Sequence, residues 1–125
     1  MPTSTRQNKQ YIGGINMDCI FCKIANHEVN SNIVYENEDI IAFEDLNPVA
    51  KVHVLVVPKK HIESVMKLED VDDKYIVEIH KAIKEVAKIK GIHESGFRVI
   101  TNYGEDGGQT VNHLHYHVMG GEKLD

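Results

Sequence analysis

Three of the eight histidines in this 125-residue chain, His113, His115 and His117, stand at alternate positions with apolar residues between them. Successive side chains of a β-strand point to opposite faces, so this spacing predicts a strand over residues 112–119 with all three imidazoles on one face. The apolar side chains between them would pack into a core from the other face. A row of imidazoles on a half-buried strand indicates a chemical role.

Imidazole suits such a role because its unperturbed pKa lets it act as acid, base, nucleophile or metal ligand near neutral pH. In one interpretation the histidines converge on a metal ion that keeps an open position for water. In another, one imidazole attacks an electrophile such as phosphorus while its neighbours hold protons and charge. Surface histidines on a solvent-facing strand are a third interpretation, which the shared register and an adjacent glycine-rich loop disfavour.

Composition and charge narrow the class of protein. Hydrophobic residues make up 42% of the chain and charged residues 26%, which is typical of one globular domain. The net charge of -5 and the lack of a basic tract disfavour binding to a nucleic acid polymer, although a site for a single nucleotide remains allowed. The sequence has no apolar run long enough to span a membrane and no signal peptide, so we expect a cytoplasmic protein that does not enter membranes.

Hydrophobic patterning predicts a compact α+β fold. We expect a short N-terminal helix, a β-hairpin, a central strand, one long helix and two final strands. In chain order these elements cover residues 19–27, 33–36 with 40–43, 52–57, 71–90, 97–101 and 112–119. They would form a five-stranded, mainly antiparallel sheet with one long helix and a short N-terminal helix. Residues 1–16 are polar and aperiodic, so we expect a flexible leader ahead of a domain at residues 17–125.

The only cysteines, Cys19 and Cys22, form a Cys-x-x-Cys motif. In a chain without an export signal this motif indicates half of a metal site or a redox pair. A redox motif of the thioredoxin type would follow a strand, which the polar stretch before Cys19 does not supply. Two thiolates provide half of a tetrahedral zinc site, so histidines would have to complete it. Two reduced cysteines packed as small apolar side chains remain the alternative.

A glycine-rich loop directly precedes the histidine strand. Gly107 and Gly108 allow backbone amides to approach a ligand closely, and Gln109 and Thr110 add side-chain donors beside them. Oriented amides, a hydroxyl group and imidazoles together suit a phosphate group. A glycine pair alone usually marks a turn, and its position next to the histidines is what favours a binding role.

Residues 113–119, His-Leu-His-Tyr-His-Val-Met, resemble the His-x-His-x-His-x-x motif, with x apolar, of the histidine triad nucleotide hydrolases and transferases. Four more segments, at 19–24, 43–48, 56–62 and 107–111, are similar in the same order to the Hint branch, the purine nucleoside phosphoramidases. The similarity covers almost all of the chain after the leader. It implies the fold of that family and an enzyme that acts on purine nucleoside monophosphate derivatives.

The resemblance also implies individual roles. His115 would attack the α-phosphorus and form a covalent nucleotidyl-histidine, which water then hydrolyses. His117, with Gln109 and Thr110, would stabilise charge on the phosphoryl oxygens. The implied substrate-binding residues are Ile20, Phe21, Phe43, Asp45, Leu46, Asn102, Gly108, Gln109, Thr110 and Val111.

Among these substrate-binding residues, Asp45 would bind the ribose hydroxyls and Asn102 would lie near the phosphate. The base pocket would be lined by the four apolar residues Ile20, Phe21, Phe43 and Leu46. For those four, simple core packing explains the pattern equally well.

The same resemblance implies one structural zinc ion per chain, held by Cys19, Cys22, His61 and His113. Four cysteine and histidine ligands leave no open coordination position, so this metal would not take part in the reaction. A homodimer is implied as well, with two sheets joined across a two-fold interface. The leaving group stays open, as do two other functions: a hydrolase with a catalytic metal ion, and a nucleotide-binding or protein-interaction module whose catalysis is incidental.

Overall fold

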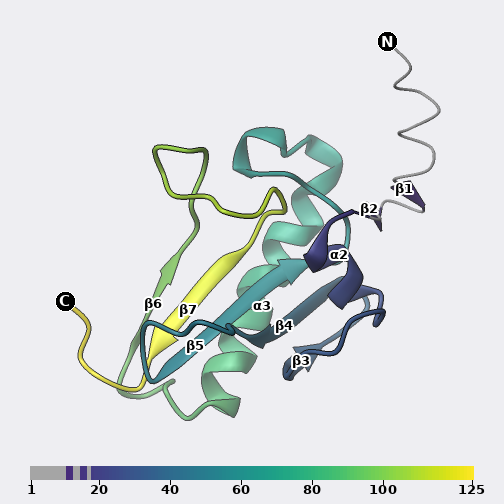
Figure 1. Ribbon diagram of the computed structural model, residues 1–125. Coiled ribbons are helices and arrows are strands. Elements are labelled where there is room, and N and C mark those ends of the chain that lie inside the picture. Colours follow the sequence, from purple (N-terminus) through teal and green to yellow (C-terminus); the bar gives the residue numbers. More distant parts are fainter. Residues whose placement is uncertain (1–10, 13–14, 17) are drawn as a thin grey trace.

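The computed structural model describes residues 18–125 and, ahead of them, residues 11–12 and 15–16 (Figure 1). Strand β1 (Tyr11–Ile12) pairs antiparallel with β2 (Ile15–Asn16) as a two-stranded unit of its own. The flexible leader expected at residues 1–16 falls mainly on positions outside those that are described. The rest of the chain forms the domain that carries the functional site.

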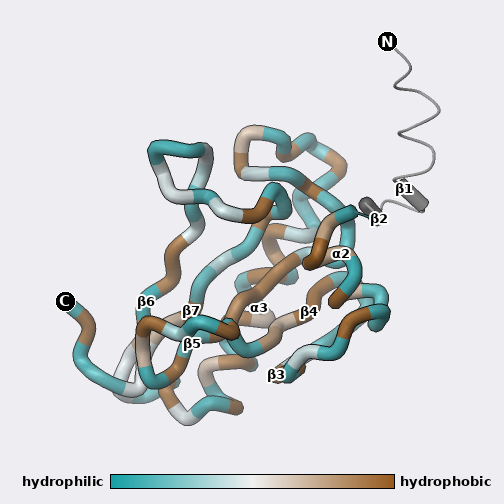
Figure 2. The backbone as a smooth tube through the Cα atoms, in the orientation of Figure 1, coloured by the Kyte–Doolittle hydropathy of each residue, from teal (hydrophilic) through white to brown (hydrophobic). Residues whose placement is uncertain are grey.

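A five-stranded antiparallel sheet, in the order β3-β4-β5-β7-β6, is the centre of this domain (Figure 1). Its strands are β3 (Ile33–Glu36), β4 (Ile40–Glu44), β5 (Val52–Pro58), β6 (Phe97–Ile100) and β7 (Tyr116–Gly120). The middle strand β5 is rich in β-branched residues and is largely hydrophobic in Figure 2. The predicted α+β class, with five strands, one long helix and a short N-terminal helix, is confirmed.

The long helix α3 (Asp73–Ile89) covers one face of the sheet and lies behind it in Figure 1. Its buried side chains Ile79 and Val86 pack in one core with the side chains of β5 that point toward the helix. Two turns of 3₁₀ helix precede it, η1 (Val65–Lys67) and η2 (Asp70–Asp72). The helix thus begins two residues later than predicted, because the chain enters it through η2. No helix among the residues described is long and apolar enough to cross a membrane.

The short helix α2 (Ile20–Ala25) covers the opposite face of the sheet. Its buried Phe21 packs in a second core that includes Leu55 of β5. Alternate residues of a strand point to opposite faces, so Val54 faces α3 whereas His53 and Leu55 face α2. Polar side chains on the α2 side of the sheet therefore meet in the space between the sheet and α2.

The histidine strand is shorter than the sequence predicts. Strand β7 begins at Tyr116 instead of residue 112, so only His117 of the three motif histidines lies within it. Just ahead of the strand, the Leu114 N–H donates to the Ile62 carbonyl at 2.6 Å, outside the sheet ladder. Leu114 still packs in the α3 core, so the predicted division of faces is right although the strand starts late.

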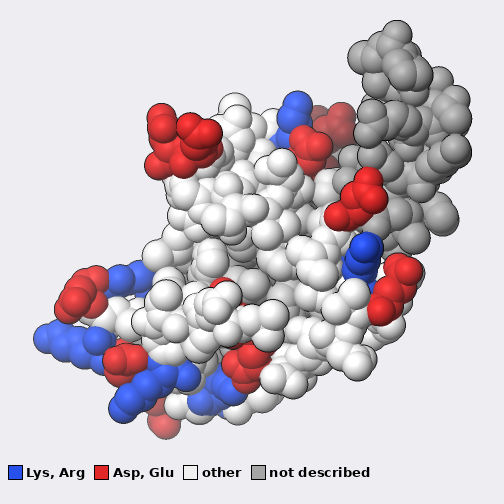
Figure 3. All heavy atoms as spheres, viewed as in Figure 1, with Lys and Arg blue, Asp and Glu red and all other residues white. Residues whose placement is uncertain are grey.

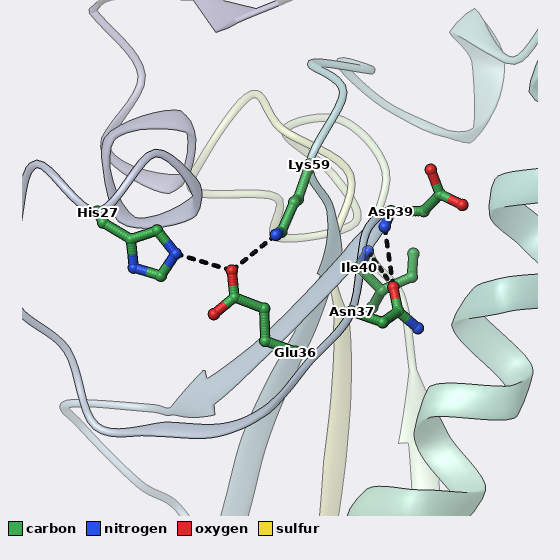
Figure 4. Close-up of polar contacts among 6 residues, drawn as sticks. All are labelled: His27, Glu36, Asn37, Asp39, Ile40 and Lys59. Carbon is green, nitrogen blue, oxygen red and sulfur yellow. Dashed lines mark hydrogen bonds and ion pairs between the residues drawn. The ribbon is translucent and has the colours of Figure 1, made fainter.

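One carboxylate ties the chain after α2 to the sheet (Figure 4). Glu36, the last residue of β3, accepts from His27 Nε2 at 2.7 Å and from Lys59 Nζ at 2.6 Å. Asn37 closes the turn between β3 and β4 by accepting from two backbone N–H groups, at 2.9 and 2.8 Å. The contacts of Glu36 hold the segment after α2 against the sheet, and α2 forms one wall of a cavity.

Candidate active site and metal cluster

A cavity of about 280 Å³ lies between α2, the sheet and the loop before β7. It is lined by Ile20, Phe21, Ile24, Val29, Asn30, Ser31, Phe43, Glu44, Asp45, Leu46, Asn47, Leu55, Thr110, Val111, His115 and His117. On the face seen in Figure 3, charged side chains lie mostly around the edge of the molecule, and the middle of the face is largely uncharged. A mainly apolar space with two imidazoles at one end suits a ligand that joins an apolar ring to a reactive polar group.

His115 has one defined nitrogen available for chemistry. Its Nδ1 lies 2.7 Å from the carbonyl oxygen of His113, and because a carbonyl only accepts, Nδ1 carries the proton. The lone pair of the neutral ring is therefore at Nε2. The Phe21 ring packs edge-on against His115 with 5.1 Å between centroids, and the Thr101 hydroxyl donates to the His115 carbonyl at 2.8 Å. These contacts fix the ring with a nucleophilic nitrogen that the backbone does not occupy.

A chain of hydrogen bonds defines the tautomer of His117. The backbone N–H of Val49 donates to His53 Nδ1 at 3.1 Å, so the neutral His53 ring carries its proton on Nε2. That N–H donates to His117 Nδ1 at 2.9 Å, and the neutral His117 ring therefore carries its own proton on Nε2. Asp45 Oδ2 lies 3.4 Å from the same His53 nitrogen. The ring centroids of His117 and His115 are 5.2 Å apart, so a ring with a donor N–H is the neighbour of a ring with a nucleophilic lone pair.

Burial keeps these two imidazoles neutral. Desolvation lowers the pKa of His115 from its ordinary value of 6.5. Desolvation also lowers the pKa of His117, and repulsion from the neighbouring His115 and His53 rings lowers it further whenever those rings carry a proton. Only a neutral imidazole has a lone pair for attack, so the environment favours the reactive form at neutral pH.

Beside the cavity, the two cysteines meet two histidines from distant parts of the chain. The sulfur of Cys19 lies 3.3 Å from Nδ1 of His113. The sulfur of Cys22 lies 3.3 Å from Nδ1 of His61 and 3.5 Å from Nδ1 of His113. One potential ligand atom of each residue lies within 4.8 Å of the others. The four residues that the family resemblance assigns to a metal site therefore form one cluster.

The donor atoms and their spacing fit a tetrahedral metal ion. Zinc with bonds of about 2.3 Å to sulfur and about 2.1 Å to nitrogen holds those atoms roughly 3.6 Å apart, close to the distances in the cluster. His113 Nε2 donates to the Pro58 carbonyl at 2.7 Å, so the lone pair of the neutral ring is at Nδ1, toward the sulfur atoms. Metal-bound histidines commonly donate their second ring N–H in this way.

The thiol of Cys19 is strongly acidic in this environment. The hydrogen bond with Cys22 contributes most, burial opposes it, and His113 and His61 add to it, which together lower the pKa of Cys19 from 9.0 to about 2. The thiolate is the form of cysteine that binds metal ions. The cluster therefore carries negative charge suited to a cation.

His113 links the cluster to the cavity. Its ring contacts Cys19, whereas its backbone carbonyl accepts from His115 Nδ1. The residue is completely buried, with 0% of its surface exposed. One buried residue therefore contributes a ring nitrogen to the cluster and the carbonyl that defines the tautomer of His115.

Comparison with known proteins identifies the family. A family model described as scavenger mRNA decapping enzyme C-term binding matches residues 18–123. The chain is 39% identical over 103 residues to Protein HitA of Neisseria gonorrhoeae, covering 82% of this chain and 95% of that protein. It is 40% identical over 102 residues to an uncharacterized HIT-like protein of Methanocaldococcus jannaschii, covering 81% of this chain and 77% of that protein. The chain belongs to the histidine triad (HIT) family.

Solved structures of HIT proteins share the fold. A histidine triad protein from Clostridium difficile is 55% identical and superposes with a TM-score of 0.85 over 88% of this chain and 96% of that chain. A HIT family hydrolase from Legionella pneumophila is 38% identical, with a TM-score of 0.83 over 86% of this chain and 96% of that chain. The HIT fold that the sequence resemblance implied is confirmed, whereas membership of the Hint branch stays a prediction.

Most of the predicted substrate-binding residues of this HIT protein line the cavity. They are Ile20, Phe21, Phe43, Asp45, Leu46, Thr110 and Val111. Phe21 and Phe43 are buried, so packing accounts for them as well as binding does. Ile20 is 43% exposed and Leu46 is 87% exposed, so core packing does not explain why these two positions are apolar.

Three other predicted substrate-binding residues, Asn102, Gly108 and Gln109, do not line the cavity. The Asn102 amide donates to the Gly107 carbonyl at 2.8 Å. The Gln109 amide donates to backbone carbonyls at 2.8 and 3.0 Å, and its Oε1 accepts from the Gly104 N–H at 3.1 Å. Gly108 has a φ of +79° in the turn. In this structure the three residues shape the loop that brings Thr110 to the cavity.

Sequence reasoning did not single out His53. It lies 5% exposed in β5, and its contact with His117 joins segments that are 64 residues apart. A signal was present, because His53 is the one polar residue in the apolar run of residues 52–57. A polar side chain inside a central strand needs a partner, which here is a motif histidine.

Proposed function

We propose that this protein is a nucleotide hydrolase of the Hint type, a purine nucleoside phosphoramidase that works through a covalent nucleotidyl group on His115. One observation carries the proposal: His115, with its lone pair at Nε2, and His117, with its N–H at Nε2, line the same mainly apolar cavity, and their ring centroids are 5.2 Å apart. The Legionella pneumophila relative, named a HIT family hydrolase, supports the hydrolase class.

The reaction would take place in two displacements. First, His115 Nε2 attacks the α-phosphorus, the bond from phosphorus to the protonated leaving nitrogen breaks, and the amine departs with the electron pair of that bond. Next, a water oxygen attacks the same phosphorus, the bond to Nε2 breaks, and its electron pair returns to His115 while the water gives up a proton to solvent. The nucleoside monophosphate leaves with the water oxygen. The His117 N–H and the Thr110 hydroxyl would donate to the phosphoryl oxygens during both displacements.

The proposed substrate fits the remaining lining of the cavity. Phe21, Phe43 and Leu46 would contact the faces of a purine base. The Asp45 carboxylate would accept hydrogen bonds from the ribose hydroxyls. These placements extend along the cavity from the histidines and leave the phosphorus at His115.

We also propose that Cys19, Cys22, His61 and His113 hold one structural zinc ion per chain. Bound there, zinc would neutralise the thiolates and join α2 to the segments that follow β5 and precede β7. The acidic Cys19 thiol and the His113 to Pro58 hydrogen bond support this assignment. Reduced cysteines as metal ligands are typical of the cytoplasm, which is the compartment we propose.

A homodimer is the assembly we propose, with sheets joined along strand β6. This strand is at the edge of the sheet, and its residues Phe97 and Val99 are each 39% exposed. An edge strand with exposed apolar side chains is a favourable surface for strand pairing. Sedimentation as a dimer at micromolar concentration is the expected result, and a monomer at all concentrations tested would contradict the assembly.

The test of the proposed function is ammonia release from adenosine 5′-phosphoramidate, measured with and without a chelator. We expect turnover by the wild type that survives chelation for as long as the protein stays folded. His115→Ala should lose this turnover, and His80→Ala is its matched control, because His80 is an exposed histidine on α3 outside the cavity. Absence of turnover with this and other phosphoramidates would contradict the proposal.

One observation favours a second candidate, a metal-dependent hydrolase. Asp45, His53 and His117 also present potential ligand atoms within 4.8 Å of one another. Two histidines and a carboxylate are a known ligand set for catalytic metal ions. This candidate predicts that chelation abolishes turnover in a protein that remains folded and that added metal restores it.

A further inference from the structure

The cavity extends across the sheet away from the histidines. His117 of β7 is paired with Leu55 of β5, Leu55 with Phe43 of β4, and Phe43 with Ile33 of β3. Three strand separations of about 4.8 Å place the two ends of this row roughly 14 Å apart. That span matches an extended nucleoside monophosphate with its phosphorus at the histidines. The base would then end near the start of β3.

Two polar residues lie at this far end. Asn30 and Ser31, in the loop between α2 and β3, line the cavity, and neither side chain hydrogen-bonds another residue in the part of the chain that the structure describes. Nearby asparagines differ: Asn26 donates to Glu28 at 3.0 Å, and Asn37 accepts from two backbone N–H groups. The hydrogen-bonding groups of Asn30 are therefore available to a ligand.

The loop that carries Asn30 is anchored on both sides. On one side the Glu28 N–H donates to the Lys23 carbonyl at 2.9 Å, and on the other the Glu44 N–H donates to the Asn32 carbonyl at 2.9 Å. Only a few residues between the anchors lack such bonds. A side chain on so short a tethered segment is held close to its place, which lowers the entropy cost of binding a ligand.

We propose that Asn30 reads the edge of the purine base and selects a 6-amino purine over a 6-oxo purine, an inference that rests on the proposed function. An asparagine amide has one acceptor and one donor group, which match the N6 amino group and the N7 nitrogen of adenine. Guanine presents two acceptors, O6 and N7, at the same edge, so the amide oxygen of Asn30 would face an acceptor. Ser31 adds a second polar group at the rim.

The test measures binding of adenosine monophosphate and guanosine monophosphate by calorimetry, together with turnover of both phosphoramidates. We expect the wild type to bind adenosine monophosphate about fivefold more tightly, a modest ratio because Asn30 is exposed to water. Asn30→Ala should bring this ratio to about one by weakening the adenine ligand alone. Asn32→Ala, an exposed asparagine of the same loop outside the cavity, should leave the ratio unchanged.

The outcomes separate this inference from the proposed function. An affinity ratio that is the same in the wild type and in Asn30→Ala, or a wild-type preference for guanine, would overturn the role of Asn30 even if the phosphoramidates are hydrolysed. A ratio that collapses in Asn30→Ala without hydrolysis of any phosphoramidate would support the role of Asn30 and contradict the proposed reaction.

Discussion

The cysteine–histidine cluster and the histidines of the cavity use imidazole in opposite ways. In the cluster, hydrogen bonds with Cys22, His113 and His61 together lower the pKa of Cys19 to about 2, so the surroundings stabilise a negative charge. In the cavity, desolvation lowers the pKa of His115 and His117, so the surroundings remove a positive charge. The two regions meet at His113, whose ring contacts Cys19 and whose carbonyl accepts from His115.

This difference shows that the alternating histidine motif does not by itself assign chemistry. His113 and His115 have the same side chain two positions apart. The ring of His113 donates to the Pro58 carbonyl and faces the sulfur atoms of two cysteines, whereas the ring of His115 donates to the His113 carbonyl and lines the cavity. In both rings a backbone carbonyl takes one nitrogen, and what the other nitrogen faces, two sulfur atoms or the cavity, determines whether it suits a metal ion or an electrophile.

The largest expected effect is the loss of the nucleophile. We expect His115→Ala to lower kcat/KM for adenosine 5′-phosphoramidate by about 10⁴-fold or more, because His117, the other imidazole among the described residues that line the cavity, carries its proton on Nε2. The same variant should still bind one metal ion per chain, as measured by elemental analysis. An active His115→Ala protein, or one that has lost its metal, would contradict the separation of the two regions.

The second largest expected effect is the loss of stability when a ligand of the cysteine–histidine cluster is removed. Cys22→Ser removes a ligand from the cluster, and we expect it to lower metal content below one equivalent and the free energy of unfolding by on the order of 3 kcal/mol. Ala25→Ser is the matched control, since Ala25 is also buried on α2 but lies outside the cluster. Chemical denaturation would measure the free energy of unfolding of both variants, and elemental analysis their metal content. Equal stability of Cys22→Ser and the wild type would contradict a structural metal.

The sequence predicted more of the fold than of the site. Strand positions and the buried stripe of α3 follow from apolar periodicity, which is a local property. The start of β7 could not be predicted, because the backbone ahead of it bonds to distant groups, such as the Ile62 carbonyl for the Leu114 N–H. The contact of His53 with His117 likewise depends on the pairing of β5 with β7.

A smaller effect is expected for the hydrogen-bonded chain behind His117. His53→Phe removes the donor to His117 Nδ1, so His117 no longer has a defined N–H toward the phosphoryl oxygens. We expect kcat to fall by about 10- to 100-fold with little change in KM. His53→Asn keeps a donor amide and should recover part of the rate. A His53→Phe enzyme with the wild-type kcat would show that the chain has no such role.

The smallest effect is the pH dependence. Because the pKa of His115 is below 6.5, we expect kcat/KM to hold as the pH falls to 6.5 and to drop about tenfold per unit only below the lowered pKa. The free energy of unfolding should depend on pH in the same direction. The unfolded chain binds the proton on His115 more readily than the folded chain does, so the contribution of His115 to stability is fully present above about pH 6.5 and is lost below it. A pH–rate profile with its acid limb above 6.5 would contradict a desolvated nucleophile.

The central claim, a covalent nucleotidyl-His115 intermediate, is tested most directly by stereochemistry at phosphorus. The measurement is hydrolysis of a P-chiral adenosine 5′-phosphoramidothioate in isotopically labelled water, with the configuration of the product determined. Two successive displacements, one by His115 and one by water, each invert phosphorus, so we predict overall retention. Overall inversion would mean that water attacks the substrate directly, and it would contradict histidine nucleophilic catalysis in this protein.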